Sequence, residues 1–330
     1  MNRRRVDLQK LVLVGILLFI TVVFTILNPR FISGFNLMYV LVQNSFVIIS
    51  ACAVTLLMIS GQIDLSIGST VCLAGMAHAW LSRAGLPVGL SFLLAILVGL
   101  LVGLINAVLV VRLKITPFIA TLGTMYMGRG LSYLVSGGLV IREGLPDVFS
   151  YVGSESLGPV PYTIVALVAV VAVFLVLERR SVLGKYSVAI GGNRTAAMLS
   201  GIDTDRIVST LYILAGAFAG FAGVLMASRL GVGDPNIGIG FEFDVIVAVI
   251  LGGTSLAGGE GSILGMIIGA LIIGGLGNGL KLLNVFTFFQ SIMKGFVLVL
   301  AVLLDQNLKL RLGRAARAGA RRAERSRERA

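Results

Sequence analysis

Histidine, cysteine and charged residues are scarce in this 330-residue chain, and each scarcity excludes a class of function. The chain has one histidine, two cysteines and 13% charged residues, whereas soluble domains carry about a quarter charged residues. Histidine-based metal sites and Ser-His-Asp catalysis therefore have almost no material. We expect no catalytic, metal or cofactor site. Cys52 and Cys72 lie inside apolar stretches and are expected to be buried, while His78, beside Trp80, is expected to place a polar tip at a membrane interface.

Apolar sequence is what the chain has in abundance. It is 57% hydrophobic, with a mean hydropathy of +1.00, which is more than one water-soluble core can hide. Helices are expected to span the membrane, because no alternating strand pattern occurs and backbone groups in lipid must pair within their own segment. The sequence therefore predicts an all-α polytopic membrane protein with about ten transmembrane helices. The predicted spans are 11–27, 37–60, 67–82, 87–111, 116–136, 161–177, 207–230, 241–258, 262–280 and 285–303.

The net charge of +12 is unevenly distributed along the chain. Basic residues crowd 309–330 and precede the first apolar run, which indicates a topogenic signal and lipid-headgroup contacts rather than nucleic-acid binding. With a cytoplasmic N-terminus, ten spans also place Arg112, Lys114 and the loop 178–206 inside. We expect both termini in the cytoplasm, residues 1–308 as one transmembrane domain, and the basic tail as a disordered extension. The first run lacks a small-x-small cleavage site and is expected to be an uncleaved span.

The 42 glycines are concentrated inside apolar runs. Gly99–Gly103, Gly216–Gly220 and Gly265–Gly269 have the small-xxx-small spacing that lets two helix backbones approach closely. These pairs predict close helix packing within one membrane domain.

Two polar, glycine-rich stretches lie between apolar runs, at 61–69 and 251–262. The first contains Asp64, which either lines a pathway at a broken helix or caps the third span at the inner boundary. The second repeats the order of an apolar run, a Gly-polar hinge and a Gly-Ser pair, although this echo is too short to establish an internal repeat. Both hypotheses for Asp64 stay open at this point.

A third polar stretch lies between the sixth and seventh runs. Asn193 is a good N-cap and Gly201 a good stop, which predicts a short cytoplasmic helix outside the membrane. So short a helix needs a surface to pack on. A compact apolar patch at Ala196, Ala197 and Leu199 favours a protein partner, with the bilayer surface as the alternative, and the two glycines before the cap would form a hinge. The coupling candidates are Gly191, Gly192, Asn193, Ala196, Ala197, Leu199, Ser200 and Gly201.

Four motifs carry a resemblance to a known family. They are GQIDLSIGS (61–69), LKITPFIATLGTMYMGRGLSYLVSGG (113–138), GKYSVAIGGNRTAAMLSGI (184–202) and AVILGGTSLAGGEGSILG (248–265). In this order, between about residues 36 and 305, the chain resembles the ribose-type sugar ABC transporter permeases. Gln62 is a departure, since the family usually has glycine there.

The resemblance implies an ABC importer permease fold in the bacterial inner membrane, working as a pair of identical or related permease subunits. It implies an ATPase with two nucleotide-binding domains beneath the pair and a periplasmic binding protein that delivers the solute. The short helix at 193–200 would be the coupling helix, and Ala197→Glu would uncouple it. Because this chain lacks a GxxxxGK[ST] loop, ATP hydrolysis is expected on the partner and the chain is not expected to be an enzyme.

The expected function is import of a small neutral solute, with a monosaccharide favoured, because the spans contain amides and hydroxyls but no cluster of Arg or Lys for an anion. An ion-coupled secondary transporter is the alternative. It would normally place several carboxylates deep in its spans, where only Asp64, Glu242, Asp244 and Lys294 are available. An intramembrane enzyme is disfavoured by the missing catalytic constellations. The substrate-path candidates are Asn44, Asp64, Ser66, Asn106, Thr121 and Asn278, about half of which we expect to face the path.

Overall fold

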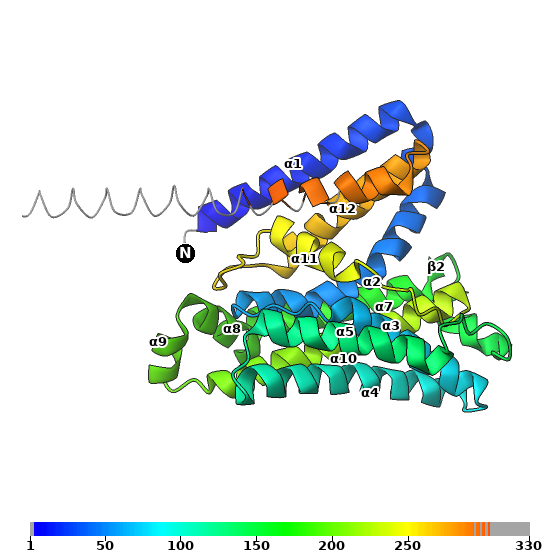
Figure 1. The fold of residues 1–330 in the computed structure, drawn as a ribbon. Helices are drawn as coiled ribbons and strands as arrows, with labels where there is room; N and C mark the ends of the chain where they lie inside the picture. The colour runs from blue at the N-terminus through cyan, green and yellow to red at the C-terminus, as the bar shows by residue number, and fades with distance from the viewer. Residues whose placement is uncertain (1–2, 294, 298, 301–302, 304–330) are drawn as a thin grey trace, which may run out of the picture.

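The computed structural model describes residues 3–293, 295–297, 299–300 and 303, and this part of the chain is mainly helical (Figure 1). The predicted span 285–303 is described only in part, and the predicted tail 309–330 lies outside the described residues. The helices are α1 (Arg3–Leu27), α2 (Gly34–Ile59), α3 (Ile67–Arg83), α4 (Val88–Ala107), α5 (Pro117–Ser136), α6 (Tyr151–Ser154), α7 (Tyr162–Arg180), α8 (Val182–Gly192), α9 (Arg194–Leu199), α10 (Thr204–Leu230), α11 (Phe241–Leu251) and α12 (Ile263–Leu282). The smaller elements are 3₁₀ turns at Pro29–Ile32 and Asp147–Ser150, a π-helical turn at Val108–Arg112, and a hairpin of β1 (Ser156–Leu157) and β2 (Val160–Pro161).

Five of these helical segments are long and apolar enough to cross a membrane. They are Gly34–Ile59, Val88–Arg112, Tyr162–Arg180, Thr204–Leu230 and Ile263–Leu282, and a shorter apolar helix covers Leu11–Leu27. The expectation of an all-helical membrane protein is thereby confirmed.

The prediction of one continuous span over 241–258 is wrong. Helix α11 ends at Leu251 after 11 residues. Gly253 then adopts a left-handed φ of 92°, which only glycine takes easily, and a Cβ at Gly252 would lie 2.4 Å from the amide nitrogen of Met266. The prediction counts these glycines as part of one apolar run, but in the structure they end the helix.

Successive helices run in alternating directions between two ends of the molecule. Figure 1 shows α8 and α9 at one end, near the start of α1, and the β1–β2 hairpin at the other. At the first end, the amide of Gly259 donates to the carbonyl of Ile59 at 2.8 Å, which joins the turns after α11 and α2. At the second end, Ile141 pairs with Gly233 across an isolated bridge.

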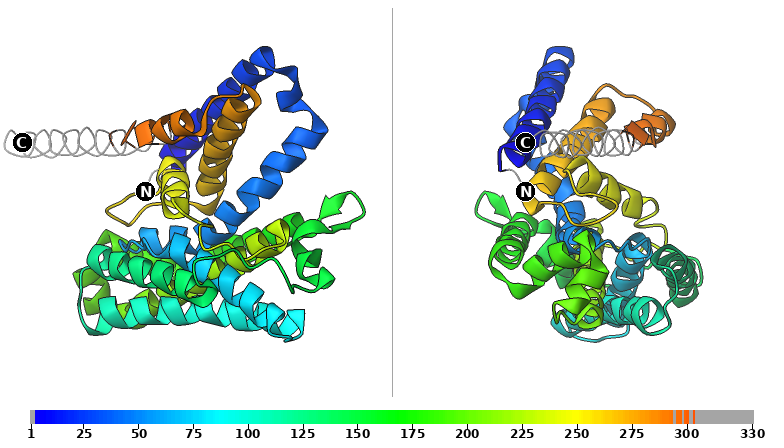
Figure 2. Two further views of the ribbon diagram at one scale, coloured as in Figure 1. Left: turned by 45° about the vertical axis from the view of Figure 1, so that its right-hand side comes forward. Right: turned by 90° about the vertical axis from the view of Figure 1, so that its left-hand side faces the viewer.

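The helices form two layers that α2 connects. Figure 2 shows α1, α11 and α12 on one side of α2, and α3, α4, α5 and α10 on the other. Helix α10 is the centre of the larger layer, since it packs against α2, α3 and α4. Helix α3 and the second half of α2 are almost wholly buried, so the polar turn between them lies inside the protein.

All three predicted glycine pairs lie at close helix contacts. Gly99–Gly103 of α4 faces Gly216–Gly220 of α10 and the backbone of Tyr212, and a Cβ at Gly216 would lie only 2.7 Å from the amide nitrogen of Gly103. The Gly265–Gly269 pair of α12 faces the backbone of α11, including the carbonyl of Ala248. Backbone meets backbone at these points, as in tightly packed membrane helices.

His78 does not lie at an interface, so that expectation is wrong. It is buried, with its Nδ1 2.9 Å from Ser91 Oγ and its ring stacked on Phe149 at 4.6 Å between centroids. Because α4 and α10 cover α3, the imidazole of His78 contacts the hydroxyl of Ser91 on α4 instead of water. Cys52 and Cys72 are buried free thiols, as expected.

Gly216→Ala should destabilise the chain because the added methyl meets backbone atoms that cannot rotate away. Overpacking of this kind costs about 1–3 kcal/mol, and we expect a lower melting temperature in detergent. Gly123→Ala is the matched control, since nothing lies within 4 Å of a Cβ at that helical position. Equal melting temperatures for the two variants would contradict the packing described here.

Candidate functional site

The turn between α2 and α3 holds a buried carboxylate. Asp64 is 1% exposed, and its Oδ1 accepts hydrogen bonds from the amide nitrogen of Ser66 at 2.8 Å and from Ser66 Oγ at 2.6 Å. Ser66 occupies the N-cap position of α3, although its side chain caps no helix amide. Asp64 therefore fixes the capping residue through an Asx-type turn and does not bind the helix amides itself.

Neighbouring helices extend this turn into a polar network. Asn106 of α4 donates from Nδ2 to Ser66 Oγ at 2.8 Å and lies 3.4 Å from both carboxylate oxygens of Asp64. Thr124 of α5 donates to Asn106 Oδ1 at 2.7 Å. The hydroxyl of Tyr212 on α10 donates to the carbonyl of Ile63 at 3.1 Å. Buried polar groups are costly unless they are paired, and this network pairs most of them.

Three of the six predicted path residues, Asp64, Ser66 and Asn106, thus meet in one network, and the structure does not bring the other three to it. Asn44 donates to the carbonyl of Val40, and its amide lies against Gly274 of α12. Asn278 exchanges two hydrogen bonds with Asn36, at 2.9 and 3.0 Å. These two asparagines join α2 to α12. Thr121 donates to the carbonyl of Pro117, one turn back in its own helix.

Thr124 and Tyr212 complete the network but were not selected from the sequence. Thr124 follows the selected Thr121 by three residues, which places both on one face of a helix, and this spacing could have pointed to it. No sequence pattern pointed to Tyr212, because its contact with Ile63 joins residues that are 149 positions apart.

The short helix outside the spans forms as predicted. Helix α9 covers Arg194–Leu199, and Asn193 is its N-cap, with Oδ1 accepting from the amide of Ala196 at 2.9 Å. After the C-cap Ser200, Gly201 has a left-handed φ of 84°, the conformation that commonly ends a helix. The preceding helix α8 was not predicted as a helix.

Two details of the predicted coupling segment need correction. Ala197 is not on an exposed patch: it is 5% exposed, within the main core, because α9 packs back on α8 and α10. Ala196 is exposed as predicted, and the large exposed apolar side chains of α9 are Met198 at 51% and Leu199 at 86%. Gly191 is a packing position rather than a hinge, since a Cβ there would collide with the carbonyl of Ile59. Ala197→Glu would disturb the core and is not a clean test of coupling.

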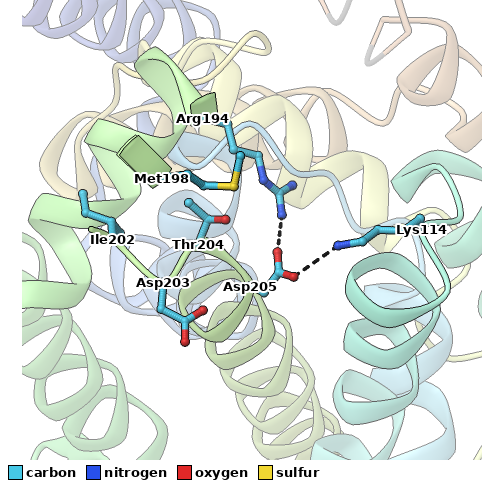
Figure 3. Close-up of a pocket in the computed structure, with 7 residues that line it drawn as sticks. All are labelled: Lys114, Arg194, Met198, Ile202, Asp203, Thr204 and Asp205. Carbon is cyan, nitrogen blue, oxygen red and sulfur yellow. Dashed lines mark hydrogen bonds and ion pairs between the residues drawn. The ribbon is translucent and has the colours of Figure 1, made fainter. Parts of the chain in front are cut away.

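An ion-pair cluster connects α9 to the rest of this end of the molecule (Figure 3). Asp205, in the first turn of α10, accepts from Arg194 Nη2 at 2.8 Å and from Lys114 Nζ at 3.1 Å. Lys114 follows α4 and has a left-handed φ of 57°. The cluster borders a pocket of about 390 Å³. One carboxylate therefore joins α9, α10 and the α4–α5 junction.

Helices long and apolar enough to cross a membrane, a buried polar network at a break between two of them, and one short exposed helix define a multi-pass membrane transport protein. The chain belongs to the family described as "branched-chain amino acid transport system / permease component", which it matches over residues 36–302. It is therefore the permease component of a transport system. No solved structure matches it.

Several of its relatives are permeases named for monosaccharides. The chain is 40% identical to the ribose import permease protein RbsC of Bacillus subtilis over 291 residues, which are 88% of this chain and 90% of the relative. It is 39% identical to the L-arabinose ABC transporter permease protein AraH of Azospirillum brasilense over 301 residues, 90% of this chain and 86% of the relative. It is 36% identical to the D-allose transport system permease protein AlsC of Escherichia coli, with 88% and 90% covered. The resemblance found in the four motifs is confirmed.

Substitutions of Asp64 should lower transport in a graded way. Asp64→Asn keeps an oxygen that accepts from Ser66 but turns a second donor towards the Asn106 amide, so we expect a loss of a few-fold with normal assembly. Asp64→Leu leaves both donors unpaired, at about 1–3 kcal/mol each, and should lower uptake more than tenfold. Uptake per permease in the membrane is the measurement, with the exposed Asp147→Asn as control. Full activity in both Asp64 variants would contradict a role for the network.

Proposed function

We propose that this chain is the permease subunit of an ATP-driven importer for a neutral monosaccharide in the bacterial inner membrane. The observation that carries the proposal is the similarity, along nearly nine tenths of the chain, to permeases named for ribose, arabinose and allose. The polar network agrees with it, because amides and hydroxyls suit sugar hydroxyls. Among the described residues, no cluster of basic side chains accompanies Asp64 that could neutralise an anion.

We further propose ten spans, with both termini in the cytoplasm, within one transmembrane domain of residues 1–308. Two observations support this topology. The loops after α2, α4, α7 and α11 gather at one end of the molecule, as alternate crossings require (Figure 1). That same end carries Arg112, Lys114 and the basic residues of the segment 178–206, and cytoplasmic loops are enriched in Lys and Arg.

The proposed partners are an ATPase subunit with two nucleotide-binding domains, a periplasmic solute-binding protein and a second permease subunit. Helix α9 is the proposed docking element for the ATPase. Its exposed residues Met198 and Leu199 give it an apolar contact surface outside the spans, and exposed apolar side chains on so short a helix favour a protein partner. The candidates from Gly191 to Gly201 therefore remain a coupling segment, with Ala197 holding α9 to the permease core.

Motion of α9 would reach the spans through two connections. Ala197 packs on the core that contains Val208 of α10, and Asp205 joins Arg194 of α9 to Lys114 before α5. Each surface ion pair is weak on its own, but together they attach α9 to two spans. Since only differential contacts shift an equilibrium, the ATPase must bind α9 differently in its two states for ATP to drive transport.

Leu199→Glu should weaken binding of the ATPase subunit. If Leu199 is a central contact, the loss is about 2 kcal/mol or more, which is about 30-fold in affinity, and ATP hydrolysis stimulated by the binding protein should fall with it. Leu157→Glu is the control for copurification, because Leu157 is also an exposed leucine but lies in the β1–β2 hairpin, at the opposite end from α9. Co-purification and ATPase assays measure both effects. Normal copurification and stimulation in Leu199→Glu would favour a loop that lies on lipid.

The solute preference should follow from the lack of a cluster of basic side chains beside Asp64 among the described residues. In uptake assays at equal concentration, a neutral monosaccharide should be imported at least about tenfold faster than its phosphate ester or a dicarboxylate, because an unpaired anion inside the membrane costs more than 1.4 kcal/mol. A phosphate ester or dicarboxylate as the best substrate would contradict the proposed substrate class.

A further inference from the structure

The chain between α10 and α11 crosses membrane depth without forming a helix. Residues 231–240 form turns and one isolated bridge residue, and α11 then has only 11 residues. At about 1.5 Å per residue it spans about 16 Å, roughly half of a 30 Å hydrocarbon core. The break also meets the middle of other spans: Pro235 contacts Cys72 of α3 and Arg129 of α5. Non-helical backbone is tolerated at this depth only where protein buries it or where it lines a cavity.

Side chains from α3 and α5 donate hydrogen bonds to two carbonyl groups of this break. Arg129 Nη1 donates to the carbonyl of Ile237 at 2.7 Å and to that of Pro235 at 3.1 Å. The Cys72 thiol donates to the carbonyl of Pro235 at 3.2 Å. The guanidinium is therefore engaged with backbone carbonyls and makes no ion pair with a carboxylate among the described residues. These hydrogen bonds fix the backbone of the break in one conformation.

Glu242 lies where the break ends and α11 begins. It is 7% exposed, and its Oε2 is buried without a hydrogen-bond partner among the described residues. This oxygen points at Gly68 in the first turn of α3, where a Cβ would collide with it. A Cβ on Gly68 would also lie 2.5 Å from the carbonyl oxygen of Gly238. Glycine at 68 is thus what lets the carboxylate reach the start of α3.

The position of Glu242 joins two features that mark solute sites in membrane transporters. Helices α3 and α11 both begin inside the protein, and the positive ends of their dipoles meet beside Gly68, an arrangement found where broken helices bind solutes. Ser66, the N-cap of α3 and a member of the Asp64 network, precedes Gly68 by two residues, so the network lies close to Glu242 along the chain. Nearly all buried polar groups in proteins are paired. The unpaired Oε2 of Glu242 is therefore available to accept a hydrogen bond from a solute.

We propose that the break at 231–240 is where the carried solute is held during passage, and that Glu242 accepts a hydrogen bond from one of its hydroxyl groups. The inference rests on the proposed function and adds a specificity-determining residue to it. The ligand class is a neutral polyol, whose hydroxyl hydrogen matches the free carboxylate oxygen. Arg129 is a positioning residue in this scheme, because it holds the break through backbone carbonyls.

The test uses the complete importer, with the permease, its ATPase and its binding protein reconstituted in liposomes. Uptake of D-ribose, 2-deoxy-D-ribose, L-arabinose and D-allose is measured for the wild type, for Glu242→Gln and for the exposed control Glu155→Gln. In Glu242→Gln we expect kcat/KM for the preferred sugar to fall about tenfold or more, and the ratio between that sugar and its poorest analogue to fall at least threefold. The melting temperature of Glu242→Gln should stay within a few degrees of the wild type, and Glu155→Gln should behave as wild type in every assay.

Unchanged uptake in Glu242→Gln, or an equal loss for all four sugars, would overturn the role of Glu242 and leave the proposed function standing. If Glu242→Gln does not assemble, Glu242→Asp keeps the charge but withdraws the carboxylate, and an unchanged sugar ratio in that variant would overturn the role in the same way. A wild-type complex that imports none of these sugars would instead contradict the proposed function, and the inference with it.

Discussion

Backbone-to-backbone contact at glycine is the constraint on which the rest of the structure depends. Lipid tails are as apolar as the helices, so burial of apolar surface does not hold the spans together, and close packing must do so. Gly216 against Gly99 and Gly103 brings α10 onto α4, and Gly223 brings α10 onto the backbone of Val71 in α3. With α10 seated, Tyr212 reaches the turn that contains the Asp64 network. The polar site thus depends on the glycine packing of α10 against α3 and α4.

The glycine-rich polar segments lie where helices stop. The turn after α2, the break before α11 and the loop after α11 are rich in glycine and in hydrogen bonds to side chains, because backbone groups freed from a helix need other partners. The turns after α2 and α11 meet each other through the amide of Gly259 and the carbonyl of Ile59, and α8 packs against both at Gly191. A change in α8 and α9 therefore has a short route to the turn that contains Asp64.

The sequence predicted what depends on local pattern and missed what depends on tertiary contact. Helix positions followed from apolar length, and α9 followed from Asn193 and Gly201, because caps act within a few residues. The prediction for 241–258 was wrong because it rested on apolar composition alone, in which a glycine that ends a helix counts the same as one within it. The burial of Ala197, and the role of Arg129 at the carbonyls of the break, could not be derived, since both depend on segments far apart in the chain.

We propose that this permease moves a neutral sugar with energy from a separate ATPase. The most direct measurement is sugar uptake into proteoliposomes that contain the permease, its ATPase and the binding protein, with and without ATP and ionophores. We predict that uptake requires ATP hydrolysis and the binding protein, and that collapsing the proton and sodium gradients leaves it unchanged. Uptake by the permease alone, driven by an ion gradient and abolished by ionophores, would contradict the account.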